Sequence, residues 1–338
     1  MQTQELVIEE PERITLQERS LDPDLKPTEA LVEAEYSIVS AGTEGATFTG
    51  LIEEMPMDWA DYPQTTGYGH LGRVQEVGES VDMCEPGDRV LSFSNHASLV
   101  KADAGRMALP VPEDADGRHL VFARMAGVSM SALRSADVDP GDTVLVIGVG
   151  LVGNFAAQLF SLAGCDVMVA DISAPRLEVA RECGIEQTVN PSERDLEDAV
   201  MDWTDGAGAH TVVEAIGNSD VIEQAVFLAQ RYGDVILLGS PRARVEIDVT
   251  PMLMHVHLEA ISIIGALEWR WPMHETPRGR DLVSNYALLA EWIATGELIV
   301  DPLLTHVAAP GECQEVYEGL TQHKNEYLGA VFDWSLLD

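Results

Sequence analysis

Residues 139–171 read DPGDTVLVIGVGLVGNFAAQLFSLAGCDVMVAD, and this stretch decides the fold. Its short apolar run at 143–147 is rich in β-branched residues, so it predicts a buried strand. A helical pattern follows over 154–163, and a second apolar strand covers 167–170. A G-x-G-x-x-G motif at 148–153 joins the first strand to the helix. The stretch therefore predicts a doubly wound unit, in which strands and helices alternate.

The glycine motif indicates a dinucleotide-binding turn. Gly148 permits a tight turn, Gly150 lets a pyrophosphate approach the backbone, and Gly153 lets the helix pack close to the strand. We expect the helix N-terminus, with Leu151 and Val152, to offer N–H groups and partial positive charge to the phosphates. The alternative is a glycine-rich turn that binds no ligand.

Asp171, at the end of the second predicted strand, indicates which dinucleotide binds. Its carboxylate can accept hydrogen bonds from both adenosine-ribose hydroxyls, whereas a 2′-phosphate would meet like charge. Asp171 therefore favours NAD over NADP. Arg176 could reach the same ribose or a phosphate, which leaves some room for NADP. Gly217 and Gly239 follow two later predicted strands, and we expect them to line the same cofactor site.

Alternating elements continue beyond residue 171 and imply a parallel sheet. The pattern predicts helices at 119–136, 176–183, 195–203, 221–230 and 282–295, and strands at 187–189, 210–214, 234–238 and 261–265. Residues 1–38 instead alternate apolar and polar side chains between prolines, which predicts an antiparallel β-domain. Polar loops are expected at 39–45 and 51–66, and a β-rich tail closes the chain. A chain of 338 residues is long enough for two such domains.

The charge of the chain argues against several kinds of partner. The formal net charge is −37, only three residues are lysine, and the acids are spread along the chain. Nucleic acid and anionic membranes would be repelled. The spread acids suggest a surface adapted to high salt, with a merely acidic mesophilic protein as the alternative. No apolar run spans a membrane, the acidic N-terminus lacks a signal core, and the cysteines are scattered, so we expect a cytoplasmic protein.

Several motifs together match one known family. They are A-G-T-E at 41–44, the G-Y-G-H…V-G run at 67–78, E-P-G-D-R-V at 85–90 and the glycine motif. Over nearly its whole length the chain resembles a medium-chain dehydrogenase/reductase of the zinc alcohol dehydrogenase type. The resemblance implies an α/β fold with a Rossmann doubly wound parallel sheet plus a GroES-like β-barrel domain. It also implies a homodimer that pairs Rossmann edge strands around residues 261–265.

The resemblance also divides the chain into domains. Residues 1–120 would form the GroES-like catalytic domain, 121–267 the Rossmann NAD-binding domain, and 268–338 the return to the catalytic domain. The cofactor of the family lies in the cleft between the two domains.

The slots for the family's zinc ligands hold other residues. Ala41 replaces the first cysteine, Tyr68 the histidine and Gly69 the adjoining glutamate. The third slot falls near Ala123, within FARMAGVSM, and the four-cysteine lobe is replaced by LSFSNHASLV. Zinc needs three or four nitrogen, sulfur or oxygen ligands, so we expect no metal at either site. These motifs resemble a zinc-less branch that includes bacteriochlorophyllide dehydrogenases and sugar- or polyol-dehydrogenase-like members.

Without zinc, a side chain must exchange the proton at the substrate oxygen during hydride transfer. Thr43 matches the family's proton-relay hydroxyl, and Tyr68 in the lost histidine slot should point into the cleft. Glu44 could orient or charge-tune its neighbours, and His70 would share the face of Tyr68 on a strand. We expect Tyr68 to polarise and protonate the substrate oxygen, assisted by Thr43 and by Glu44 or His70. In the alternative, Tyr68 only fills the vacant zinc space, His70 is structural and Glu44 caps a turn.

Three functions stay open at this point. The leading hypothesis is an NAD(H)-dependent, zinc-independent oxidoreductase that interconverts a small secondary alcohol, polyol- or sugar-like, and its ketone. A quinone or enoyl reductase is the second, although such enzymes usually prefer NADPH, which Asp171 opposes. The third is a non-catalytic NAD-binding protein, since cofactor motifs without zinc ligands would also suit a decayed enzyme.

Overall fold

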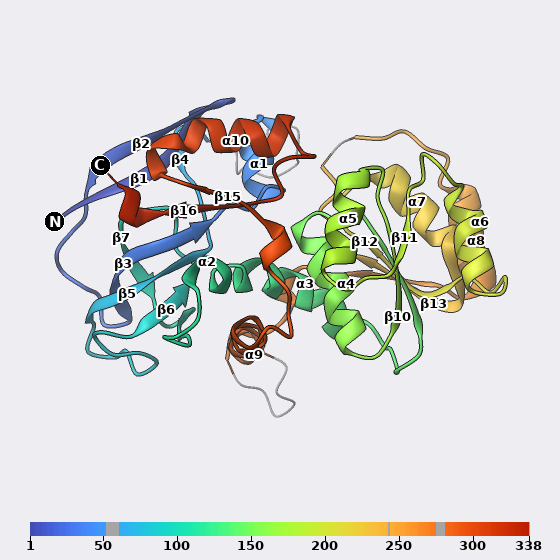
Figure 1. Cartoon of the computed structure of the whole chain (residues 1–338), viewed down its shortest axis with the longest axis horizontal. Helices are drawn as coiled ribbons and strands as arrows, with labels where there is room; N and C mark the ends of the chain where they lie inside the picture. Colours follow the sequence, from blue (N-terminus) through green and yellow to red (C-terminus); the bar gives the residue numbers. More distant parts are fainter. Residues whose placement is uncertain (52–60, 243, 275–280, 338) are drawn as a thin grey trace. The chain divides into compact units, whose positions relative to one another are not determined.

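The computed structural model describes residues 1–51, 61–242, 244–274 and 281–337 (Figure 1). The chain forms two compact units, Met1–Met125 with Met273–Asp338, and Ala126–Pro272. Both termini lie in the first unit. Most of the loop expected at 51–66 falls on residues 52–60, outside the described residues. The predicted domain boundaries at residues 120 and 267 stay a proposal.

The unit Ala126–Pro272 is built on a six-stranded sheet in the order β11-β10-β9-β12-β13-β14. All of its strand pairs are parallel. The order reverses between β9 and β12, which makes this a Rossmann doubly wound sheet. The strands are β9 (Thr143–Ile147), β10 (Asp166–Ala170), β11 (Gln187–Val189), β12 (Ala209–Glu214), β13 (Ala229–Leu237) and β14 (Ser262–Gly265).

Helices cover both faces of this sheet, because successive residues of a strand point to opposite sides. On one face Val144 and Val146 share an apolar cluster with Phe160 of α4. On the other face Leu145 shares a cluster with Val226 of α7. Burial on both sides explains why 143–147 is continuously apolar. The helices are α3 (Ala123–Ser135), α4 (Leu151–Leu162), α5 (Ala174–Glu182), α6 (Leu196–Trp203), α7 (Ser219–Leu228) and α8 (Thr250–Glu259).

The other unit holds two sheets with mixed strand directions. One has the order β2-β1-β4, and the other has the order β15-β16-β3-β5-β6-β8, with β7 paired to β3. Only the pair β15·β16 is parallel among the described strands of these sheets. The chain's last strand, β16, pairs with β3, so the C-terminal segment returns to the N-terminal sheet. The antiparallel pairing expected for residues 1–38 is confirmed.

The elements of this unit have the following bounds. The strands are β1 (Gln2–Glu10), β2 (Arg13–Ser20), β3 (Glu29–Ile38), β4 (Gln64–Thr65), β5 (His70–Val77), β6 (Arg89–Ser92), β7 (Leu99–Asp103), β8 (Ala108–Pro110), β15 (Leu304–Ala308) and β16 (Gly329–Asp333). The helices are α1 (Thr43–Phe48), α2 (Gly117–Leu120), α9 (Leu282–Thr295) and α10 (Cys313–Gln322). Short 3₁₀ turns occupy Glu268–Arg270, Asp301–Leu303, Pro310–Glu312 and Trp334–Leu336. In the described part of the chain, no helix combines the length and apolarity needed to cross a membrane.

Two sequence predictions about helices were wrong. The polar loop expected at 39–45 gives way to α1, which begins at Thr43 and buries Glu44 and Phe48. Its glycine and threonines are weak helix formers, so tertiary packing rather than propensity stabilises this helix. In the tail expected to be β-rich, α10 buries Cys313 and Val316, with Tyr317 and Leu320, at helical spacing.

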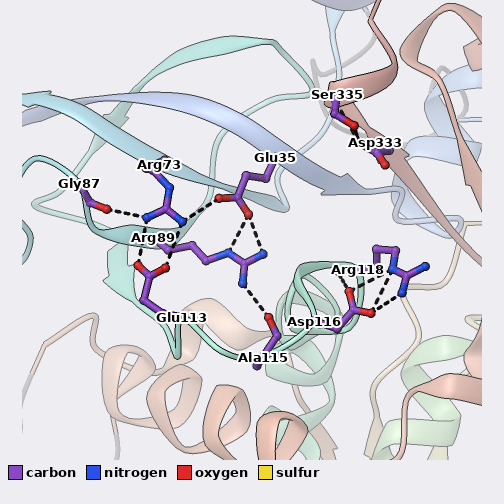
Figure 2. Close-up of polar contacts among 10 residues, drawn as sticks. All are labelled: Glu35, Arg73, Gly87, Arg89, Glu113, Ala115, Asp116, Arg118, Asp333 and Ser335. Carbon is purple, nitrogen blue, oxygen red and sulfur yellow. Dashed lines mark hydrogen bonds and ion pairs between the residues drawn. The ribbon is translucent and has the colours of Figure 1, made fainter.

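A cluster of ion pairs ties three strands of the larger sheet together (Figure 2). Glu35 of β3 lies between Arg73 of β5 and Arg89 of β6, at 3.4 and 2.6 Å. Arg73 also contacts Glu113 at 3.0 Å, and Arg89 donates to the carbonyl of Ala115 at 2.7 Å. Because Arg89 is buried, its pair with Glu35 is screened by salt less than an exposed pair.

Candidate functional site

The glycine motif forms the turn between β9 and α4. Gly148 has a φ of +92°, a left-handed conformation that favours glycine. A Cβ at Gly153 would lie 1.8 Å from the carbonyl oxygen of Gly148, so only glycine lets α4 pack this close. A Cβ at Gly150 would meet nothing nearer than Nη1 of Arg176, at 4.0 Å. The space at the Cβ position of Gly150 is therefore open.

Helix α4 begins at Leu151, three residues earlier than the sequence pattern predicted. The apolar periodicity starts late because the first helical turn consists of the motif itself. The N–H groups of Leu151, Val152 and Gly153 belong to this first turn, where a helix has no internal acceptors for them. These residues thus present the positive end of the helix beside the open backbone of Gly150.

Asp171 follows β10, and its carboxylate forms hydrogen bonds to the glycine turn and to the start of α5. One carboxylate oxygen accepts the N–H of Val149 at 2.9 Å, and the other accepts the N–H of Ser173 at 2.8 Å. Each oxygen of a carboxylate can accept two hydrogen bonds, so both retain capacity for a ribose hydroxyl. Ser173 in turn caps α5, the helix that carries Arg176. The structure thus brings Gly150, Asp171 and Arg176 to the same end of the sheet.

Gly217 and Gly239 lie beyond the carboxyl ends of β12 and β13, where their backbones are packed together. A Cβ at Gly239 would lie 2.2 Å from the nitrogen of Gly217, so neither turn has room for a side chain. The buried Glu214 shapes this region, because its Oε1 accepts the N–H groups of Ile216 and Gly217 at 2.9 and 2.8 Å. Burial raises the pKa of Glu214, against the effect of these backbone donors. Sequence reasoning had not singled out Glu214.

In the other unit, the hydroxyl of Tyr68 has two other side-chain hydroxyls as hydrogen-bond partners. The half-buried phenol donates to Oγ of Ser40, and the side chain of Thr43 is a second hydrogen-bond partner. Burial raises the pKa of Tyr68; the negative charge of Glu44 acts in the same direction, whereas Arg124 and the two hydroxyls act against it. The phenol is therefore protonated at neutral pH. Of the predicted catalytic residues, the structure brings Tyr68 and Thr43 into direct contact.

Glu44 is buried in a network rather than exposed in a site. Its Oε1 accepts the N–H of Ser40 at 2.8 Å. Its Oε2 accepts from Thr66 at 2.9 Å, from His96 at 3.0 Å and from the hydroxyl of Tyr317. Burial acts to raise the pKa of Glu44, but His96 and the donors outweigh it, so this pKa lies below the usual range. The carboxylate is ionised at neutral pH and acts on Tyr68 through its charge.

His96 and Tyr317 were missed at the sequence level. His96 is fully buried, and its Nδ1 lies 2.8 Å from Oγ of Ser37, which accepts the indole N–H of Trp334 at 3.0 Å. These residues come from distant parts of the chain, so no local spacing links them to Glu44. Together they connect α1 to the sheet and to α10.

His70 is placed differently from Tyr68. Its ring is wholly buried at the start of β5, and its Nε2 lies 3.3 Å from the carbonyl oxygen of Ala97. Within the described residues its Nδ1 has no partner. Burial lowers the pKa of His70 to about 4, so the ring is neutral at neutral pH. The argument from strand alternation does not apply, because Tyr68 precedes the strand that begins at His70.

Arg124 lies beside Tyr68 and Gly69, two of the residues predicted to stand at zinc-ligand slots. Its guanidinium carbon lies 4.5 Å from the ring centroid of Tyr68, and its Nε donates to the carbonyl of Tyr68 at 2.9 Å. A Cβ at Gly69 would lie 2.9 Å from Cγ of Arg124, so the arginine uses space that the glycine leaves open. Arg124 was not predicted as a site residue, because the segment around Ala123 was considered only for metal ligands.

The residues at these slots do not fit a zinc ion. Ala41, Gly69 and Ala123 have no side-chain donor, and the guanidinium beside Tyr68 would repel a dication. Across the ranges that the structure describes, no group of three or more His, Cys, Asp or Glu side chains is arranged to hold a metal ion.

Comparison with known proteins identifies the family. The family described as zinc-binding dehydrogenase matches residues 152–282. The erythritol/L-threitol dehydrogenase of Mycolicibacterium smegmatis is 26% identical over 326 residues, which cover 78% of this chain and 89% of that protein. These matches support the medium-chain dehydrogenase/reductase superfamily. As a member of this superfamily it is an oxidoreductase.

Solved structures of dehydrogenases share the fold over the whole chain. A proposed zinc-binding dehydrogenase of Sinorhizobium meliloti, bound to NADP, has a TM-score of 0.82 and 20% identity, over 98% of this chain and 99% of that one. The alcohol dehydrogenase RspB of Escherichia coli, in complex with NADH, has a TM-score of 0.82 and 18% identity with the same coverage. The α/β fold with a Rossmann sheet and a second sheet domain is thus confirmed.

Proposed function

We propose that this medium-chain dehydrogenase/reductase is an NAD(H)-dependent, zinc-independent enzyme that interconverts a polyol- or sugar-like secondary alcohol and its ketone. The observation that carries the proposal is the phenol of Tyr68 in the zinc-ligand region, with Ser40 and Thr43 on its oxygen and Arg124 on its ring. The relative named for erythritol and L-threitol supports a polyol as the substrate.

The choice of NAD rests on Asp171, because the neighbouring structures hold both NADH and NADP. The two carboxylate oxygens of Asp171 suit two ribose hydroxyls and oppose a 2′-phosphate. The glycine turn with Leu151 and Val152 would hold the pyrophosphate, and Arg176 would add a positive charge. The turns at Gly217 and Gly239 would complete the site. When bound, the nicotinamide supplies or accepts the hydride.

Tyr68 would handle the proton at the substrate oxygen. As the carbonyl carbon is reduced, its oxygen gains negative charge and takes the proton of the Tyr68 hydroxyl. Ser40 and Thr43, which contact this hydroxyl, would then donate hydrogen bonds to the phenolate until it takes up a proton from water. Oxidation runs these steps in reverse and needs the deprotonated phenol. Because burial and Glu44 raise the pKa of Tyr68, oxidation should accelerate toward alkaline pH.

Glu44 enters this scheme only through its charge, and His70 takes no part in it. Glu44 is held by its buried donors and would tune Tyr68 by charge. His70 is neutral and buried, so we leave it out of the proton path.

The test follows nicotinamide absorbance with NAD⁺ and NADP⁺ against alcohols, polyols and sugars, in molar salt, with and without a chelator. We expect NAD⁺ reduction that a chelator does not change. Tyr68→Phe should lower kcat by about 10²–10⁴-fold and still bind NADH. Tyr232→Phe makes the same change at a tyrosine that is 69% exposed, and serves as the matched control.

Other outcomes would redirect the proposal. Loss of activity with the chelator, or full turnover by Tyr68→Phe, would refute the zinc-free mechanism. If the protein binds NADH but turns over no substrate of the panel, the result would favour the quinone or enoyl reductase, or the non-catalytic binding protein.

We also propose a cytoplasmic homodimer. Strand β14 is at the edge of the six-stranded sheet, and the neighbouring helix α8 has no buried residue among those described. Leu253, Met254 and Leu258 of α8 are at least 53% exposed, and Ile263 of β14 is 39% exposed. Apolar side chains gathered at a strand edge suit pairing with a second copy. Leu258→Asp should yield monomers by light scattering, and an unchanged mass would count against this interface.

A further inference from the structure

Arg124 is the largest fully buried side chain of the described residues, and it lies among aromatic rings. Its guanidinium carbon is 4.5 Å from the ring centroids of both Tyr68 and Phe93, and 5.7 Å from that of Tyr286. The faces of aromatic rings carry partial negative charge and attract a cation at these distances. The rings therefore help to keep a positive charge in a position that is only 1% exposed.

Hydrogen bonds fix the orientation of this cation. Nε of Arg124 donates to the carbonyl of Tyr68 at 2.9 Å, and Nη1 donates to the hydroxyl of Tyr286. Tyr286 is fully buried on α9, and its hydroxyl also lies 3.4 Å from the carbonyl oxygen of Arg124. The missing side chain of Gly69 gives the arginine its room. Arg124 thus holds Tyr68 both by its backbone and by its ring.

The need to fill the space beside Gly69 does not explain why the side chain at position 124 is charged. Burying a guanidinium costs solvation free energy, and apolar side chains of similar volume often replace buried ionic groups without loss of stability. Above Gly69, a methionine or leucine would fill the same volume at lower cost. The retained charge is best explained by an effect on the group that it contacts, the phenol of Tyr68.

We infer that Arg124 is a positioning residue, which orients Tyr68 and stabilises the negative charge left when its hydroxyl proton moves to the substrate oxygen. The inference rests on the proposed role of Tyr68. In the reduction direction the O–H bond of Tyr68 breaks, the proton joins the substrate oxygen, and the phenolate remains beside the guanidinium. The hydride that reduces the carbon comes from the nicotinamide, so no further reactant is needed.

The charged groups acting on Tyr68 oppose each other. Burial and the Glu44 carboxylate raise the pKa of Tyr68, whereas the Arg124 guanidinium lowers it. Without Arg124, no cation would offset the carboxylate, and only the hydroxyls of Ser40 and Thr43 would act against it. The proton of the Tyr68 phenol would then be harder to remove, and oxidation would be slowed more than reduction.

The test compares Arg124→Gln, Arg124→Lys and the wild-type enzyme in pH profiles of kcat for alcohol oxidation. The alkaline limb is the part of this profile in which kcat rises with pH. Removing the cation should shift this limb to higher pH by about one unit or more, so kcat at a given pH on the limb should be about ten-fold lower. Lysine keeps the charge but lacks the planar fork, so Arg124→Lys should restore most of the limb. KM should change less than kcat. If a folded Arg124→Gln protein has its alkaline limb at the same pH as the wild type, the inference is overturned.

A milder variant keeps the inference testable if Arg124→Gln does not fold. Tyr286→Phe removes the hydroxyl that receives Nη1 but keeps the cation and the ring. It should lower kcat several-fold without moving the limb, because only the orientation is loosened. Wild-type kcat in Tyr286→Phe would overturn the positioning role.

Near-ultraviolet titration of tyrosine separates this inference from the proposed function, because it needs no turnover. The signal lost in Tyr68→Phe identifies the Tyr68 phenolate, and this signal should appear at higher pH in Arg124→Gln than in the wild type. If Tyr68→Phe is inactive and the titration is the same with and without Arg124, only the inference fails. If Tyr68→Phe keeps full turnover, the proposed function fails instead.

Discussion

Acid should destabilise the protein through His70, and the structure gives the size of the effect. Neutral His70 donates from Nε2 to the carbonyl of Ala97, so the second proton would have to bind at Nδ1. In the described part of the chain Nδ1 has no partner, and the ring is fully buried. Burial, with a smaller contribution from His96, lowers the pKa of His70 from 6.5 to about 4.

The sign and the pH window follow from this shift. The folded state binds the proton more weakly than the unfolded state, so His70 stabilises the fold above pH 6.5 and loses this contribution as pH falls toward 4. One pKa unit corresponds to about 1.4 kcal/mol, so the full loss is about 3 kcal/mol. About 2 kcal/mol of it should appear between neutral pH and about pH 5.

The assay is urea unfolding of the wild type and of His70→Gln at several pH values and constant salt. Glutamine keeps an N–H donor toward Ala97 but cannot gain a charge. The free energy of unfolding of the wild type should therefore fall relative to the variant by about 2 kcal/mol as pH drops from neutral to about 5. All other titrating groups are common to both proteins and cancel. Parallel curves over this range would refute the reasoning.

Four further predictions concern the glycine turn, the cofactor, the buried carboxylate and the surface charge. Gly153→Ala should cost about 1–3 kcal/mol of stability in thermal melts, because its Cβ would lie 1.8 Å from the backbone oxygen of Gly148. Gly150→Ala is the matched change with open space around the Cβ, so it should stay folded and lose NADH affinity in a fluorescence titration. Asp171→Asn should lower the NAD⁺-to-NADP⁺ ratio of kcat/KM by about 10–100-fold, and an unchanged ratio would exclude the ribose contact. Glu44→Gln should lower the free energy of unfolding at neutral pH by about 1–3 kcal/mol, since His96 loses an ionised acceptor, and a neutral result would mean that the network rearranges. With a net charge of −37, the melting temperature should rise from low to molar sodium chloride, and a flat response would refute a salt-adapted surface.

Local sequence patterns predicted elements of both units well. The strand at 143–147 and the helix at 282–295 match β9 and α9 residue for residue, because apolar periodicity and turn residues bound both elements. Helix α8 was missed because none of its described side chains is buried, so no apolar stripe marks it. The start of α4 was placed late because a glycine motif resembles a loop in propensity.

The candidate catalytic region was predictable only in part. Tyr68 and Thr43 were found from their slots in a family pattern, and the structure places them in contact. The partners of Glu44 come from residues 96 and 317, and such long-range contacts leave no local signal in one sequence. Arg124 did have a signal, since it is a charged residue in the otherwise uncharged FARMAGVSM segment.

The cluster around Glu35 bears on how this protein could be adapted to dilute buffer. The chain has 20 basic residues against 57 acidic ones, and Arg73 and Arg89 are both committed to this one cluster. Replacing exposed acids elsewhere with neutral residues would relieve repulsion that salt otherwise screens. Replacing Glu35 would also remove a negative charge but leave the buried Arg89 without its carboxylate, so a redesign guided by net charge alone would weaken the link between three strands.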